Sequence, residues 1–288
     1  MLVRLMGMSS LKRTFADPRH GQIAALSCLI LLGSIIYAFE MPWWRPITGL
    51  SAAIFVQWIA ARALGWGFDW RSPTISALSL TLLLRTDGPW LVVLAALIAI
   101  GSKALIRVNG RHLFNPTALG IVITVLAFPG AWISPGQWGT AGWIVIAAAG
   151  CGLAVTYGAR RLEVPLCFLA AWAALCFGRA LVIGDPMAIP VHQMSSGALL
   201  VFAFFMISDP MTAPWNQRAR ITWVCVVAAI AFALQTSWIV TAGPLYGLVL
   251  AAPLVPLLNA LFPAPVARWR PSSPASSQPK GAPTCVPS

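Results

Sequence analysis

The sequence predicts an all-α polytopic membrane protein with ten transmembrane segments, arranged as two inverted repeats of five helices, with both termini inside. Three observations predict this fold. Of the 288 residues, 59% are hydrophobic and only 9% are charged, whereas soluble domains average roughly a quarter charged residues. The basic residues fall on alternate connections between apolar runs, and short interrupted runs recur at matching places in two halves. A single soluble enzyme domain is therefore excluded.

Ten apolar runs are separated by charged residues or by clusters of Pro and Gly. In the first half they cover residues 21–39, 47–61, 74–84, 90–106 and 116–128. In the second half they cover residues 141–157, 164–183, 194–207, 221–234 and 242–262. The runs predict an N-terminal cytoplasmic segment (1–20), a first repeat (21–128), an external loop (129–140), a second repeat (141–263) and a Pro- and Ser-rich tail (264–288). We expect the tail to be disordered because it has few large apolar groups.

The positions of Lys and Arg set the orientation, because cytoplasmic loops of membrane proteins are enriched in these residues. If the segments alternate from an inside start, 16 of the 19 Lys and Arg lie on inner connections. The three outer exceptions are Arg45, Arg85 and Arg179. Most tryptophans lie in connections or near the ends of runs, as in an aromatic belt. The net charge of +12 is thus explained by the lipid bilayer, and we expect no nucleic-acid partner.

The third and eighth runs suggest that the two halves are related by duplication. Both runs look too short to cross about 30 Å of hydrocarbon at about 1.5 Å per residue. Each is third in its half and leads into a polar turn that ends in Pro-Trp, at Pro89 and at Pro214. Pro116 and Pro244 begin the fifth and tenth runs at a similar offset. Because five is odd, the second half would enter the membrane inverted, with a binding site between the halves. Ordinary short or tilted helices are the alternative for each run alone.

A polar stretch leads into the fifth run from the inner side. Lys103, Arg107 and Arg111 lie within nine residues, next to a helix start. Such a start favours a phosphate or carboxylate, because its free N–H groups attract anions. Anchoring at the inner surface of the membrane explains the cations equally well. Asn115 with Pro116 also fits a helix N-cap followed by proline at the first helical position, so both interpretations remain open.

Asp209 ends the short eighth run on the same inner face, and Thr212 follows it. If that run is a half-helix, Asp209 is a functional candidate within the membrane; otherwise Asp-Pro is a solvated turn. No acid lies in the middle of a long apolar run, which disfavours a stand-alone proton pump. We expect His112 and the other two histidines to be interfacial, and the sequence predicts no catalytic residue and no metal site.

Two motifs resemble a known family. Residues 103–117 read KALIRVNGRHLFNPT, and residues 203–214 read AFFMISDPMTAP. They are similar, in the same order, to motifs of the D subunit of Rnf electron-transport complexes and the B subunit of sodium-translocating NADH:quinone reductase. The resemblance covers most of residues 15–265. The segments 17–19 and 134–139 are similar to a shorter subgroup, called Rnf D-like or enediyne-biosynthesis-associated membrane proteins. The resemblance implies ten helices in two inverted halves and a bacterial inner (plasma) membrane location.

The resemblance also implies a flavin. In the full-length family, FMN is attached through a phosphoester to the threonine of an S-G-A-T motif, on the outer side between the fifth and sixth helices. The corresponding loop here, from Pro129 to Thr140, lacks that motif, and the context of Thr140 differs. We therefore expect FMN or riboflavin to bind non-covalently, or a quinone to bind instead. The matched positions give the candidate binding residues, which are Arg107, Asn115, Thr117, Asp209 and Thr212.

Two functions are compatible with these patterns. The first is a membrane subunit that couples electron transfer through a flavin or quinone to ion transport, with other membrane and soluble redox subunits as partners. The second is a non-redox transporter or channel for an ion or small molecule on the same scaffold, which the missing S-G-A-T motif favours. A purely structural anchor is third, and the paired short segments count against it.

Overall fold

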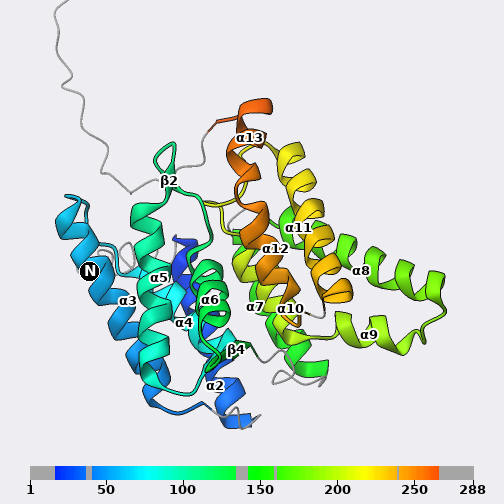
Figure 1. Ribbon diagram of the computed structural model, residues 1–288, viewed down its shortest axis with the longest axis horizontal. Helices are drawn as coiled ribbons and strands as arrows, with labels where there is room; N and C mark the ends of the chain where they lie inside the picture. The colour runs from blue at the N-terminus through cyan, green and yellow to red at the C-terminus, as the bar shows by residue number, and fades with distance from the viewer. Residues whose placement is uncertain (1–16, 37–40, 134–141, 159–160, 239, 266–288) are drawn as a thin grey trace, which may run out of the picture.

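The computed structural model describes residues 17–36, 41–133, 142–158, 161–238 and 240–265. Most of these residues are helical (Figure 1). The helices of the first half are α2 (Pro18–Ile36), α3 (Trp44–Ala63), α4 (Arg71–Leu83), α5 (Pro89–Leu105) and α6 (Pro116–Ala127). Each of them coincides, within a few residues, with one apolar run of the sequence. The N-terminal segment and the C-terminal tail predicted above lie almost entirely outside the described residues, as does most of the external loop.

In the described residues, the second half contains three continuous helices, α7, α8 and α11, and two bent helix pairs. Its elements are α7 (Gly142–Gly158), α8 (Glu163–Ile183), α9 (Ala188–Met194), α10 (Gly197–Val201), the π-helical turn η2 (Phe202–Met206), α11 (Gln217–Ser237), α12 (Gly243–Ala251) and α13 (Leu254–Leu261). The chain bends by 46° between α9 and the α10–η2 helix, and by 52° between α12 and α13. A Ser-Ser-Gly sequence stands at the first bend and Pro253 at the second, and both are common causes of kinks.

Helix length and composition support a membrane location. Helices α8 and α11 are each long and apolar enough to cross a membrane, and each bent pair also qualifies when its two parts are taken together. The described residues thus contain two to four candidate spans by this measure, and α5 and α6 are shorter apolar helices. The protein is a mostly helical membrane protein, and its division into ten segments in two inverted repeats stays a prediction.

Four short strands depart from the all-α prediction. β1 (Leu84–Thr86) pairs antiparallel with β4 (Ala131–Ile133), and β2 (Arg107–Val108) pairs with β3 (Arg111–His112). Asn109 and Gly110 close the second pair with φ values of 51° and 77°. Positive φ at both central residues of a two-residue hairpin, with the sequence Asn-Gly, is typical of a type I′ turn. The polar stretch before α6 is therefore a hairpin.

Corresponding helices of the two halves pack against corresponding neighbours. Helix α5 packs against α3 and α6, as α11 packs against α8 and α12. A Cβ atom on Gly120 would lie 2.6 Å from the carbonyl oxygen of Ala95, and one on Gly247 would lie 2.8 Å from that of Val227. Small residues at such positions let helix backbones approach closely. The pairs α5–α6 and α11–α12 are therefore built alike.

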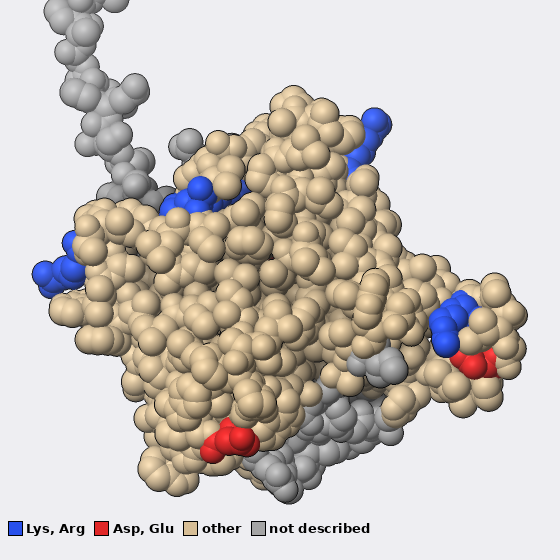
Figure 2. Space-filling view, in the orientation of Figure 1, with Lys and Arg blue, Asp and Glu red and all other residues tan. Residues whose placement is uncertain are grey.

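The outer surface suits lipid. Large apolar side chains point away from the bundle, and several are more than two-thirds exposed: Ile35, Leu105, Leu126, Leu181 and Val182. The face in Figure 2 carries Lys, Arg, Asp and Glu only near its edges, around a broad area of other residues. Exposed apolar surface of this extent marks a membrane or protein contact.

The charge pattern places three arginines outside, and each of them lies in an ordered part of the structure. Arg45 is buried, and its Nη2 donates a hydrogen bond to the carbonyl oxygen of Thr86 at 3.5 Å. Arg85 lies within strand β1. Arg179 forms an ion pair with Asp185 at 2.7 Å. Two of these three residues thus have partners within the protein, Arg85 is part of a strand, and the orientation stays a prediction.

Candidate functional site

A cavity of about 410 Å³ lies between the helices of the first half and the broken helix of the second half; we call it the polar cavity. Four of the five predicted binding residues line it: Arg107, Asn115, Thr117 and Asp209. Thr212 does not. Its hydroxyl donates to the carbonyl oxygen of Asp209 at 3.4 Å, and the residue lines a separate space of about 30 Å³. The structure therefore brings four of the five residues to one place, while their binding role stays a prediction.

Asn115 joins two distant parts of the chain. Its Oδ1 accepts a hydrogen bond from the N–H of Ala118 at 3.0 Å, so Asn115 is the N-cap of α6. Its Nδ2 donates to the carbonyl oxygen of Met206 at 3.0 Å. The N-cap interpretation is thus confirmed, and both polar atoms of this buried amide are used by the protein. Asn115 thus shapes the cavity, and its role in binding a ligand stays a prediction.

The π-helical turn η2 ends at the polar cavity. Carbonyl oxygens at a helix end have no partner within the helix, and here side chains supply the partners. Gln22 of α2 donates through Nε2 to the oxygen of Phe205 at 3.3 Å, and Asn115 donates to that of Met206. π-Helical turns are rare and frequently mark functional sites. The first half therefore holds the broken helix of the second half through two side-chain amides.

Lys103 is a cation in the wall of the polar cavity. It lies at the end of α5, and its Nζ donates to Ser72 Oγ at 2.9 Å and to Gln57 Oε1 at 3.2 Å. Both accepting oxygens belong to neutral side chains, so neither hydrogen bond neutralises the positive charge of Lys103. Lys103 is absent from the predicted binding set. Lys103 follows the buried Ala99 by four residues and the buried Ala95 by eight, and this helical spacing places it on the inner face of α5.

His112 and Asp209 face each other across the two halves. His112 Nε2 lies 3.7 Å from Asp209 Oδ2, and Asp209 Oδ1 accepts from the N–H of Met211 at 2.9 Å. Burial raises the pKa of Asp209, but His112, the Met211 N–H and the charge of Arg111 outweigh burial and lower it, so the carboxylate is charged. The side chain of His112 is only 9% exposed and lies beside Asp209, while its position at the membrane interface stays a prediction.

The two arginines of the β2–β3 hairpin have different surroundings. The guanidinium of Arg111 donates to the carbonyl oxygen of Pro210, lies 5.9 Å from the centre of the Trp215 ring and is buried. Burial lowers the pKa of Arg111, although the charge of Asp209 opposes this effect. Arg107 is exposed and lies 4.5 Å above the Trp66 ring. Arg111 therefore fixes the second half in place, and Arg107 stands at the edge of the polar cavity.

Four charged residues form a network beside the polar cavity. Asp17 pairs with Arg19 at 2.6 Å and with Arg71, and Asp69 pairs with Arg19 and, at 3.2 Å, with Arg71. Partial burial raises the pKa of Asp17, but the two arginines outweigh it and lower the pKa from 3.8 to about 2. The network ties the start of α2 to the start of α4.

The donors of the polar cavity suit acceptor oxygens better than a metal ion. Lys103, Arg107 and Gln57 present N–H groups, while Asp69 and Asp209 are the acids of the wall. Across the described parts of the chain, no group of three His, Cys, Asp or Glu residues is placed to hold a metal ion. The volume lies within the range of about 300–1,000 Å³ that is usual for small-molecule and cofactor sites. A ring system with carbonyl oxygens or a phosphate group matches this chemistry.

Comparison with known proteins finds similarity in the second half of the chain. Residues 133–267 match the model of the NQR2, RnfD, RnfE family. The chain is 29% identical over 123 residues, 43% of its length, to the D subunit of the ion-translocating oxidoreductase complex of Escherichia coli O1:K1 / APEC. It is 25% identical over 118 residues, 41% of its length, to the protein of the same name from Cronobacter sakazakii (strain ATCC BAA-894). The match spans 34% of the length of each of these relatives.

The family match lies in the half that contains the broken helix α9–η2, Asp209 and the motif at residues 203–214. Nothing in these comparisons separates the shorter Rnf D-like subgroup from the rest of the family. The second half of the chain is thus similar to the NQR2, RnfD, RnfE family model and to part of the ion-translocating oxidoreductase D subunits.

Proposed function

We propose that the whole chain is a bacterial inner-membrane subunit of a redox complex, in which a flavin in the polar cavity takes part in electron transfer coupled to ion transport. The observation that carries this proposal is the polar cavity itself. It lies between the two halves, it has the size of a cofactor site, and Lys103 presents a positive charge to it. The relatives named above are subunits of ion-translocating oxidoreductase complexes, and other membrane and soluble subunits are the partners that we propose for this chain.

The residues of the polar cavity fit FMN or riboflavin. The bound flavin would supply one- and two-electron transfer, while the protein supplies position and electrostatics. Lys103 and Gln57 would donate to acceptor oxygens of the ring system or of a phosphate. A positive charge from Lys103 would favour a reduced flavin that carries negative charge. Asn115 and Gln22 would hold the π-helical end of η2 that forms the opposite wall.

Non-covalent attachment belongs to the same proposal. The family's S-G-A-T motif is absent from the loop between α6 and α7. Thr140 of that loop lies outside the described residues. The proposal therefore depends on the polar cavity, which the described helices form, and not on Thr140.

Titration of the protein in lipid nanodiscs tests the proposal. Riboflavin and FMN are added separately, and binding is followed by quenching of flavin fluorescence. We expect Lys103→Gln to weaken binding about tenfold or more, because a hydrogen bond from a charged donor contributes about 1.5–3 kcal/mol. Arg62→Gln, which removes an inner cation that lies over Trp58 of α3, is the matched control. Equal affinities for the wild type and a folded Lys103→Gln protein, or no saturable binding at all, would overturn the proposal.

The second candidate function is a non-redox transporter or channel for an ion or small molecule. The observation in its favour is the pair of bent helices, α9–η2 and α12–α13, since interrupted helices of this kind build the binding sites of secondary transporters. A purified protein that neither contains nor takes up flavin, but moves a solute in proteoliposomes, would establish this function in place of the first.

A further inference from the structure

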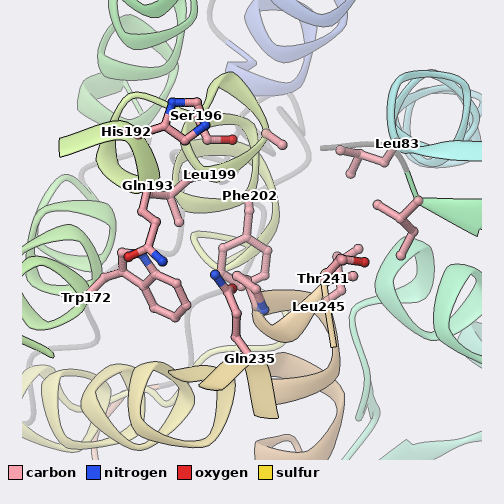
Figure 3. Close-up of a pocket in the computed structure, with 14 residues that line it drawn as sticks. Leu83, Trp172, His192, Gln193, Ser196, Leu199, Phe202, Gln235, Thr241 and Leu245 are labelled. Carbon is pink, nitrogen blue, oxygen red and sulfur yellow. The ribbon is translucent and has the colours of Figure 1, made fainter. Parts of the chain in front are cut away.

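The two ends of the bundle differ in charge. A second cavity, of about 430 Å³, lies at the end away from the polar cavity; we call it the apolar cavity (Figure 3). Helix α4 shows the separation, because Ser72 in its first turn lines the polar cavity and Leu83 at its end lines the apolar one. In the part of the chain that the structure describes, the wall of the apolar cavity contains no Lys, Arg, Asp or Glu. Charged side chains gather instead at the end of the polar cavity.

Arg161 is a buried cation at this charged end. It stands between α7 and α8, and its backbone N–H donates to the carbonyl oxygen of Thr156, a residue of the polar cavity wall, at 3.0 Å. The residue is only 8% exposed, and its Nη1 has no hydrogen-bond partner among the described residues. Buried charges in proteins are normally paired, because burial without a partner is costly. An anionic partner would therefore stabilise Arg161.

The two acids whose charge acts on Arg161, which are Glu163 and Asp209, have other partners. Glu163 Oε1 accepts from Nη2 of Arg220 at 2.7 Å and from its Nε at 3.1 Å. Asp209 Oδ2 lies 3.7 Å from Nε2 of His112. Neither acid forms an ion pair with Arg161.

The surroundings of Arg161 are positively charged. Burial, followed by the charge of Arg220, lowers the pKa of Arg161 from 12.5 to about 10; Arg111 acts in the same direction, and Glu163 and Asp209 oppose it. The side chain therefore still carries its charge at pH 7. Three arginines thus meet two acids in this region, and the excess of positive charge attracts an anion.

The surface near Arg161 suits lipid. Helix α8 begins two residues later, is long and apolar enough to cross a membrane, and is largely not buried by the rest of the protein. Leu166, near the start of α8, is 48% exposed, and Tyr157, at the end of α7, is 76% exposed. Basic sites between membrane helices, at the level of the headgroups, bind anionic lipids in other proteins. The position of Arg161 at the start of a lipid-facing helix is of this kind.

We propose that Arg161 binds the phosphate group of an anionic phospholipid, whose acyl chains cover α8 near Leu166. A guanidinium matches a phosphate well, because two N–H groups can donate side by side to two oxygens. The excess of arginines favours a headgroup with net negative charge. Inorganic phosphate offers the same oxygens, but it has no chains to cover Leu166 and Tyr157. This inference does not rest on the flavin proposed for the polar cavity.

Thermal unfolding of the full chain, freed of lipid in dodecyl maltoside, tests the proposal. Four additions are titrated separately: phosphatidylglycerol, phosphatidylcholine, which has a phosphate but no net charge, diacylglycerol, which has no phosphate, and inorganic phosphate. We expect saturable stabilisation by phosphatidylglycerol, at a concentration at least several-fold lower than for the other three. Equal effects of the three lipids would overturn the proposal. Stabilisation by inorganic phosphate at the same concentration as by phosphatidylglycerol would overturn the assignment to a lipid.

Two variants connect the binding to Arg161. Arg161→Gln should weaken the effect of phosphatidylglycerol about tenfold or more, because it removes a charged donor. Arg161→Lys keeps the charge but not the paired N–H groups, so it should retain the preference for phosphatidylglycerol over phosphatidylcholine with weaker binding. Arg62→Gln, which removes the same charge from an exposed residue near the end of α3, is the matched control and should bind as the wild type does.

Stability without lipid separates binding from a purely structural role. Lipid-free Arg161→Gln should unfold at the same temperature as the lipid-free wild type or higher, because it removes a buried charge that has no partner. A side chain that only held the fold together would give the opposite result. If Arg161→Gln responds to phosphatidylglycerol as the wild type does, or if it is less stable than the wild type without lipid, the assignment is wrong.

Discussion

Asn115 shows how single side chains connect the two halves. Its Oδ1 caps α6, and its Nδ2 holds the carbonyl oxygen of Met206, which is 91 residues away. The Asn-Pro pair is sufficient to predict the cap, since Asn as N-cap before Pro is a local pattern. The contact with Met206 depends on tertiary packing, which no local pattern contains. The contact of His112 with Asp209 likewise depends on tertiary packing, and no local pattern of the sequence contains it.

The first prediction concerns the two bonds of Asn115. Asn115→Ala should destabilise the protein by about 2 kcal/mol, because it removes a cap worth about 1 kcal/mol and a buried hydrogen bond to the carbonyl oxygen of Met206 worth about 0.5–1.5 kcal/mol. Asn115→Asp keeps the acceptor and removes the donor, so it should still lower the melting temperature. Thermal unfolding in detergent measures both variants.

Asn216 provides the matched control for this prediction. It caps the exposed start of α11 by accepting from the N–H of Arg218 at 2.9 Å. Asn216→Ala should therefore cost only the cap, about 1 kcal/mol. Equal losses for Asn115→Ala and Asn216→Ala would show that the bond to Met206 contributes nothing.

The second prediction is a dependence of stability on pH at Asp17. Its folded pKa is about 2, below the ordinary value of 3.8, so the charged form is favoured in the folded protein. The stability that it contributes is complete above about pH 4 and is lost as the pH falls toward 2. The melting temperature of the wild type should therefore fall more between pH 5 and pH 3 than that of Asp17→Asn. Parallel falls in the two proteins would count against the network of Asp17 with Arg19 and Arg71.

At the scale of elements, the sequence predicts helices well and their breaks less well. The apolar runs match the described helices because burial in lipid or in the bundle demands continuous apolar stretches. The run at residues 194–207 predicts one segment, yet the helix is bent near Ser195 and begins earlier, at Ala188. Propensity cannot predict the π-helical turn η2, because the side chains that bind its carbonyl oxygens come from α2 and from the start of α6. The Asn-Gly pair before α6 is typical of a β-hairpin turn. The hairpin is not among the elements predicted from the sequence, because the apolar composition of the chain favours helices.

The third prediction tests the similar packing of the two helix pairs. An added methyl group at Gly120 or Gly247 would overlap a backbone carbonyl of the neighbouring helix. Gly120→Ala and Gly247→Ala should each destabilise the protein by roughly 1–3 kcal/mol, as overpacking does in other cores. Gly101→Ala, at a helical position with open space, should be neutral or stabilise by about 0.5–1 kcal/mol. A harmless substitution at Gly120 or Gly247 in thermal unfolding would contradict the close approach.

For the molecule as a whole, charge and hydropathy establish a membrane protein, and the structure adds two cavities at opposite ends. The cations on alternate connections predict the orientation, since they depend only on sequence order. The cavities could not be predicted, because each gathers residues from several helices and from both halves, as Leu83 and Trp172 do in the apolar cavity. The similar packing of α5–α6 and α11–α12 supports the proposed duplication. The opposite direction of the second half remains to be measured.

The fourth prediction concerns that direction. Single cysteines replace exposed residues in a background without native cysteines: Asp87 and Asn109 in the first half, His192 and Arg218 in the second. A membrane-impermeant maleimide should label Asp87→Cys and His192→Cys from outside intact cells. Asn109→Cys and Arg218→Cys should react only in inverted vesicles. Labelling of Asp87→Cys and Arg218→Cys from the same side would contradict the inverted arrangement, because each follows the third segment of its half.

The most direct test of the central claim, a flavin held without a covalent bond in the polar cavity, is the visible absorption spectrum of protein purified from flavin-replete cells, followed by acid precipitation. We predict flavin bands at about one flavin per chain, with all of the flavin released into the supernatant. Flavin retained in the pellet would contradict non-covalent binding and direct attention to Thr140 or another hydroxyl. A colourless protein that also fails to take up riboflavin or FMN would contradict the claim itself.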